Sequence, residues 1–221
     1  QIVFAALDGD TPRLWLRSLG DTAATPLSDT EGGRHPFWSP DGYAIAFFTG
    51  NALKRLDLGG ASGNRNARML ARVLNGTGGT WSAAGDIIFV LSVTSPLMRV
   101  SANGGAATPI TAVGSNHLGH TSPQFLPDGQ QFLFLVRGSP EARGIYLGAL
   151  DGRAPTRLTS ADAGLTYLPS GWVLWLREGS LVGQRLDAAR GTLVGEIITV
   201  ADGVQDDGSG QGALTASSSG L

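Results

Sequence analysis

A short motif ending in glycine recurs five times along the chain and constrains the fold more than any other feature. Trp-Ser-Pro-Asp-Gly at 38–42 is followed by Trp-Ser-Ala-Ala-Gly at 81–85, Phe-Leu-Pro-Asp-Gly at 125–129, Tyr-Leu-Pro-Ser-Gly at 167–171 and a degenerate Ala-Ser-Ser-Ser-Gly at 216–220. The motif glycines are therefore 43, 44, 42 and 49 residues apart. A regular spacing of this size indicates one structural unit that is repeated along the chain.

The sequence between the motifs predicts β-strands and no helices. Each of the first four glycines precedes a short apolar run, such as Asp86-Ile87-Ile88-Phe89, and then an alternating run, such as Leu53 to Leu58. Short apolar or alternating runs bounded by Gly, Pro and Asp are typical of strands. Four strands in a repeat of roughly 40–45 residues are the pattern of a β-propeller blade.

We therefore predict an all-β fold, a five-bladed β-propeller of four-stranded antiparallel blades forming a single domain over residues 1–221. The predicted blades are 1–27 with 213–221, 36–71, 79–111, 122–159 and 164–200. If the chain end is joined to its beginning, Phe4 falls five residues after Gly220, and the corresponding aromatic follows the motif glycine by four or five residues in the other copies. We expect the N- and C-terminal segments to pair in one blade and close the ring, which removes exposed sheet edges. Two stacked β-sandwiches explain neither the period nor this phase, and the irregular copies argue against a designed ring.

The repeats resemble those of the TolB-like β-propeller family. The resemblance is carried by the segments 14–19, 33–42, 53–58, 123–129 and 181–187, and it is closest to the C-terminal propeller, or sensor domain, of bacterial serine/threonine protein kinases. The chain has no kinase His-Arg-Asp loop and no Asp-Phe-Gly motif, so it would correspond to a non-catalytic part. The resemblance implies a sensor or interaction module with a periplasmic or otherwise extracytoplasmic location, which the sequence itself leaves unknown.

Composition excludes several classes of function. The net charge of −2 and the isoelectric point near 5.9 argue against a nucleic-acid partner. The absence of cysteine excludes disulfides and thiolate chemistry. Apolar runs are too short to insert into a membrane, and no signal peptide is visible at the first residues. We expect a monomer.

The predicted binding surface consists of the loops that lead from each outer strand to the next inner strand, because these loops share one face around the channel mouth. They are 28–35, 72–80, 112–122, 160–166 and 201–212, and their candidate residues are Glu31, Arg34, His35, Asn116, His117, His120, Asp206 and Asp207, with Asp29 and Asp162 nearby. We predict a non-catalytic scaffold with no cofactor that binds a protein or peptide, or a small molecule, there. The sequence thus favours a protein that is not an enzyme.

The alternative is a zinc-dependent hydrolase at the same channel mouth. His35, His117 and His120 would be the zinc ligands, with Glu31 or Asp206 as the general base, because three imidazoles leave a fourth position for water. A structural interpretation competes at each residue. His120 can cap its strand, and the motif Asp41 can hydrogen-bond its own turn. The repeated aromatics Trp38, Trp81, Phe125 and Tyr167 are interpreted as packing between neighbouring blades.

Overall fold

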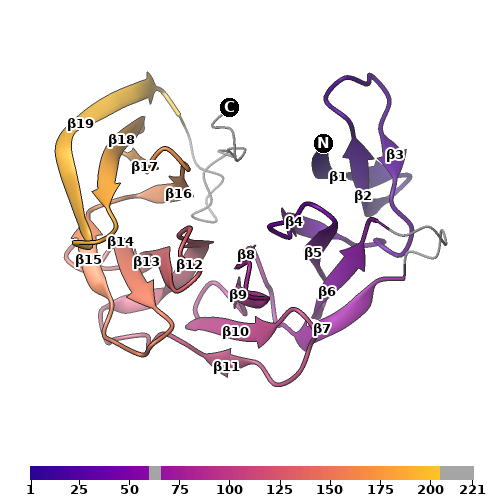
Figure 1. The fold of residues 1–221 in the computed structure, drawn as a ribbon, viewed down its shortest axis with the longest axis horizontal. Coiled ribbons are helices and arrows are strands. Elements are labelled where there is room, and N and C mark those ends of the chain that lie inside the picture. Colours follow the sequence, from indigo (N-terminus) through magenta and orange to yellow (C-terminus); the bar gives the residue numbers. More distant parts are fainter. Residues whose placement is uncertain (60–65, 205–221) are drawn as a thin grey trace. The chain divides into compact units, whose positions relative to one another are not determined.

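The computed structural model describes residues 1–59 and 66–204, and β-strands are the only regular secondary structure in this part of the chain. Within these residues, nineteen strands form five antiparallel sheets, four of them four-stranded and the first three-stranded (Figure 1). In each sheet the strands follow one another in chain order, as in the blades of a β-propeller. The chain divides into two compact units. The first is Gln1–Ser92 with Met98–Pro109, and the second is Val93–Leu97 with the chain from Ile110.

The first unit contains three sheets. Their strands are β1 (Ile2–Asp8), β2 (Thr11–Arg17) and β3 (Thr25–Pro26); β4 (Arg34–Trp38), β5 (Ala44–Thr49), β6 (Ala52–Asp57) and β7 (Arg68–Arg72); and β8 (Gly79–Trp81), β9 (Asp86–Val90), β10 (Leu97–Ser101) and β11 (Thr108–Pro109). Leu97, the first residue of β10, belongs to the second unit. The predicted outer strands with Pro26 and Pro109 are confirmed, and both prolines lie in two-residue edge strands where no N–H is needed.

The second unit contains the other two sheets. Their strands are β12 (His117–Phe125), β13 (Gln131–Gly138), β14 (Gly144–Ala149) and β15 (Thr156–Thr159); and β16 (Ala163–Tyr167), β17 (Trp172–Arg177), β18 (Ser180–Asp187) and β19 (Thr192–Asp202). The all-β class and the count of five sheets agree with the sequence prediction. Residues 213–221, predicted to complete the first sheet, lie outside the described residues, so ring closure and the single domain stay predictions.

Four of the predicted connecting loops, 28–35, 72–80, 112–122 and 160–166, extend too far, because β4 begins at Arg34, β8 at Gly79, β12 at His117 and β16 at Ala163. The difference is largest at β12. The sequence placed residues 112–122 in a loop, but β12 begins at His117 and contains His117 and His120. The His120 N–H donates to the Ser95 carbonyl at 3.1 Å, and a Cβ on Gly119 would lie only 2.7 Å from Thr94 Cα. Contact with the 93–95 segment therefore holds these residues in extended form. Two bulges, one of them at Ser122 and Pro123, interrupt the pairing of β12 with β13. They also break the alternation of apolar and polar residues by which a strand is recognised in the sequence.

The cores lie between neighbouring sheets. Phe47, Phe89, Phe134 and Trp175, the aromatics of the second strands, are at most 1% exposed. The repeated first-strand aromatics are only partly buried: Trp38, Trp81 and Tyr167 pack at the margins of three clusters, and Phe125 meets Phe132 edge to face at 6.4 Å. Trp38, Trp81 and Tyr167 thus pack where sheets meet, as predicted, whereas Phe125 contacts a ring of its own sheet. Phe47, Phe89 and Trp175 belong to the buried clusters themselves.

We predict from this difference that the second-strand aromatics contribute more to stability than the motif aromatics. Phe89→Ala should lower the free energy of unfolding by about 3–5 kcal/mol, because it empties a fully buried site. Trp81→Ala, at a partly buried site in the same sheet, should cost less. Urea unfolding of both variants measures the difference, and equal losses would contradict the assignment.

Candidate functional site

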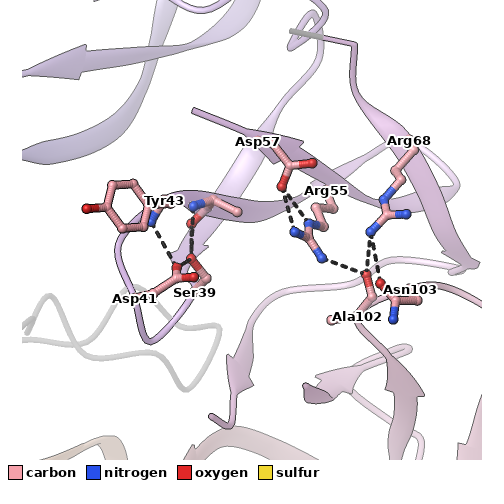
Figure 2. A network of polar contacts seen from close by, with 9 residues as sticks. Ser39, Asp41, Tyr43, Arg55, Asp57, Arg68, Ala102 and Asn103 are labelled. Carbon is pink, nitrogen blue, oxygen red and sulfur yellow. Dashed lines mark hydrogen bonds and ion pairs between the residues drawn. The ribbon is translucent and has the colours of Figure 1, made fainter. Parts of the chain in front are cut away.

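The motif carboxylates are used by their own turns, as the sequence predicted. Asp41 accepts hydrogen bonds from the Ser39 hydroxyl at 2.6 Å and the Tyr43 N–H at 3.0 Å (Figure 2). Both bonds lower the pKa of Asp41, the Ser39 bond most. Asp128 accepts from the N–H groups of Gln130 and Gln131 at 3.0 and 2.9 Å. Burial raises the pKa of Asp128, but these bonds outweigh it and lower the pKa. These carboxylates stabilise hairpins and are poor candidates for a general base.

Figure 2 also shows how arginines connect two sheets of the first unit. Arg55 on β6 and Arg68 on β7 both donate to the carbonyl of Ala102, at 3.1 and 3.0 Å. Arg55 also pairs with Asp57 at 2.7 Å and lies over the Trp81 ring, 5.0 Å from its centroid. This network is structural, since each guanidinium is directed at a backbone or ring of the neighbouring sheet.

The predicted site residues of the first unit are Glu31, Arg34 and His35. Glu31 forms an ion pair with Arg13, and its pKa is lowered by a hydrogen bond from its own backbone N–H and by Arg13. Arg34 and His35 open β4 instead of ending the preceding loop, and His35 has a φ of 48°. The His35 ring meets Phe48 edge-on, with centroids 6.5 Å apart. A carboxylate with a lowered pKa is a weak base, so Glu31 is less suited to that role than the sequence suggested.

The predicted site residues of the second unit form a hydrogen-bonded chain. The Leu97 N–H donates to Thr111 Oγ1 at 2.9 Å, and Thr111 Oγ1 lies 2.8 Å from His120 Nδ1. His120 Nε2 lies 3.1 Å from His117 Nδ1. The backbone carbonyl of Asn116, the residue just before β12, accepts a hydrogen bond from the Ser139 N–H at 3.0 Å.

The chain favours one arrangement of protons. Thr111 Oγ1 already accepts from Leu97, so its hydroxyl hydrogen is free to donate to His120 Nδ1. In that arrangement the proton of neutral His120 is on Nε2, and the Nε2–H group donates a hydrogen bond to His117 Nδ1. His120 is 2% exposed and its ring packs on Phe134, with centroids 5.1 Å apart. Burial first, and the nearby His117 second, lower the pKa of His120 to about 4.

The described residues contain no group of three or more His, Asp or Glu side chains that could hold one metal ion. His117 and His120 do lie together, but both ring nitrogens of His120 already have partners within the protein. Asp206 and Asp207 lie outside the described residues. The three-histidine zinc site with His35 therefore stays a prediction, and zinc binding would require His120 to exchange a hydrogen bond for a metal bond.

Sequence reasoning missed a pocket of about 230 Å³ in the second unit. The pocket lies at the start of β13, the end of β14 and the β18–β19 turn, which is the end of these sheets opposite to His117. Arg153 and Arg190 contribute to its lining, but each already pairs with an aspartate of its own turn, Asp151 at 3.0 Å and Asp187 at 3.5 Å. Arginine beside a hairpin Asp in consecutive repeats, at Asp151-Gly-Arg153 and Asp187-Ala-Ala-Arg190, was the sequence signal available.

No protein-family model matches the sequence, and no curated protein matches it. Solved structures do. TolB from Acinetobacter baumannii has a TM-score of 0.66 and 18% identity over 84% of this chain and 49% of TolB, so this chain spans about half the TolB length. A protein of a nidogen/laminin complex has a TM-score of 0.68 and 11% identity over 91% of this chain and 78% of the other. Oligogalacturonate lyase in complex with manganese has a TM-score of 0.58 and 19% identity over 86% of this chain and 58% of the lyase chain.

These likenesses show the fold and no more than the fold. The chain resembles TolB-like β-propeller proteins, and the same fold serves a protein assembled with a partner and an enzyme. Within residues 1–59 and 66–204, no helix is long and apolar enough to cross a membrane.

We predict that protonation of His120 destabilises the protein in mild acid. The folded pKa of about 4 lies below the ordinary value of 6.5, so the unfolded chain binds the proton more tightly. The contribution of neutral His120 to the free energy of unfolding is therefore fully present above pH 6.5 and is lost as the pH falls toward 4. The free energy of unfolding should decrease by about 2 kcal/mol between pH 7.5 and 5. Urea unfolding at both pH values measures the loss.

The His120→Gln variant should lose most of this pH dependence, whereas the matched His35→Gln variant should retain it. Equal pH dependence in the two variants would show that another group is responsible.

Proposed function

We propose that the chain is a non-catalytic β-propeller module that binds a protein or peptide partner through the end of the sheets where β12 and β16 begin. The observation that supports this most is that the motif carboxylates and both ring nitrogens of His120 are occupied by scaffold contacts. Chemistry-bearing side chains in repeat positions thus maintain the fold, which leaves the connecting loops to recognise a ligand. The likeness to a protein solved in a nidogen/laminin complex is consistent with such a role.

The TolB-like resemblance further suggests that the module is extracytoplasmic and belongs to a sensor region such as that of a bacterial serine/threonine kinase. This part of the proposal rests on the repeat motifs and on the fold likeness to TolB. The enzyme alternative rests on the three histidines with Glu31 or Asp206 as the base, and no distance or contact among the described residues favours it over the scaffold role.

Replacement of the loop at one end of the second unit tests the binding role. Gly-Ser substitution of residues 112–116, which precede β12, should abolish capture of partner proteins from extracts of the producing cells. The matched replacement of residues 152–155, in the β14–β15 connection at the opposite end, should leave capture intact. Both proteins should unfold at similar urea concentrations. If capture survives replacement of residues 112–116 and is lost on replacement of residues 152–155, the binding surface lies at the opposite end of the sheets and the proposal is contradicted.

We also propose that residues 213–221 supply the fourth strand of the first sheet. β1 is the edge of that sheet, whereas its counterparts β5, β9, β13 and β17 each lie between two strands. In all four complete sheets, the motif aromatic on the first strand lies opposite the residue of the second strand that follows the motif glycine by two or three positions. Trp38, for example, lies opposite Ile45, and Tyr167 lies opposite Val173. The same register would place Leu214 opposite Val3 or Phe4.

Engineered cysteines test this register, because the natural chain has none. Leu214→Cys combined with Phe4→Cys or Val3→Cys should form a disulfide under mild oxidation, since paired strands bring Cα atoms to about 4.5–5.5 Å. Leu214→Cys combined with Leu7→Cys, at the far end of β1, is the control and should stay reduced. Mass spectrometry of peptides reads both, and cross-linking in the control alone would refute the register.

A further inference from the structure

Two arginines extend the buried core between the two sheets of the second unit. Leu133 and Leu135 on β13 and Val173 and Trp175 on β17 belong to one buried cluster. Alternate residues of a strand share a face, so the next residue in the row on β13 is Arg137 and the next in the row on β17 is Arg177. The apolar rows from both sheets thus end in a guanidinium.

The two strand ends lie close together in space. Asp162, which precedes β16, pairs with Arg143 in the β13–β14 loop at 3.4 Å. The same aspartate accepts the Glu178 N–H at 2.7 Å, and its own N–H donates to the Leu176 carbonyl at 2.9 Å. One residue therefore contacts both the connection after β13 and the end of β17, which is the end of the sheets proposed to bind a partner.

Arg137 and Arg177 are half-buried, and their backbones pair within their sheets. Within the described part of the chain, however, neither guanidinium makes a hydrogen bond or an ion pair with another residue. Other arginines of this unit do: Arg143, Arg153 and Arg190 pair with aspartates. A guanidinium is always charged and carries five N–H donors, so two of them without an acceptor at one end of a core favour a bound anion.

Among the described residues, none of the nearby carboxylates pairs with Arg137 or Arg177. Asp162 is bound by Arg143 and by the Glu178 N–H. Glu141, in the β13–β14 connection, is exposed and forms no ion pair with either arginine among the described residues. Glu178 follows Arg177 directly but forms no ion pair with it among the residues described. The described chain thus supplies no carboxylate for either arginine.

We propose that Arg137 and Arg177 form an anion-recognition site and that the partner presents it with carboxylates of an acidic peptide segment. The planar guanidinium fork matches a carboxylate in bidentate geometry, and partial burial strengthens such a pair. The inference rests on the proposed binding role and names the chemistry of its partner.

The test uses an octapeptide of glutamate with an N-terminal fluorescein, and the matched glutamine octapeptide, in fluorescence anisotropy with the whole chain. The glutamate peptide should bind and the glutamine peptide should not. Arg137→Gln or Arg177→Gln should weaken binding about tenfold each, the cost of one charge-assisted bond. The double variant should weaken it about a hundredfold. Arg153→Gln, an exposed arginine at the opposite end of the sheets, is the matched control and should bind as the parent does.

Several results would overturn the inference. These are no binding of the glutamate peptide by the parent, equal binding of the two peptides, or unchanged binding by the double variant. If inorganic phosphate displaces the bound glutamate peptide completely, the two arginines would be assigned to phosphate recognition instead. The melting temperatures of the two variants should equal or exceed that of the parent, and a clear fall would assign both arginines a structural role.

Failure of this site is distinguishable from failure of the binding role. If replacement of residues 112–116 abolishes partner capture but the double arginine variant captures normally, the module binds without these arginines. If replacement of residues 112–116 leaves capture intact while the peptide results hold, the two arginines bind anions but the captured partner binds elsewhere on the protein.

Discussion

Burial of apolar rows between neighbouring sheets is the interaction on which the rest of the structure depends. A four-stranded antiparallel sheet has two faces, and a single sheet cannot remove both from water. Phe89 and Trp175 occupy the second strands of their sheets and are fully buried because an adjacent sheet covers them. Removing apolar area from water contributes about 25 cal/mol per Å². Each sheet is therefore stable only beside its neighbour, which is the physical reason for a repeated architecture.

Hairpin chemistry supports this packing at low cost. Asp41 and Asp128 satisfy backbone N–H groups within their own turns, so the chain reverses without exposing unpaired donors. Gly148, whose Cβ would lie 2.6 Å from the Phe132 ring, lets that ring pack across its own sheet. A repeat position that must satisfy a turn or admit a ring has little freedom to evolve chemistry. This explains why recognition in such a fold is expected in connections and at the ends of strands.

The second unit carries the features with the clearest functional meaning. His120 is buried, neutral and hydrogen-bonded on both sides, which makes it a structural histidine whose protonation opposes folding. Arg137 and Arg177 are the opposite case, because they are charged, half-buried and unpaired within the described residues. The contrast separates a polar group whose hydrogen bonds are satisfied inside the protein from polar groups that the proposed anion would satisfy. The likeness to TolB and to a protein of a nidogen/laminin complex is a likeness of fold.

The sequence by itself determined the class of fold, the five repeats, most strands and the role of the motif aspartates. It could do so because strand alternation and turn chemistry are local. It failed at β12, where contact with residues 93–95 makes a strand of an expected loop and bulges break the alternation. It also could not reveal that Thr111 and His117 occupy the nitrogens of His120. Nor could it reveal that the Arg137 guanidinium has no acceptor among the described residues. Whether a polar side chain is satisfied depends on residues distant in sequence, so only the tertiary structure decides it.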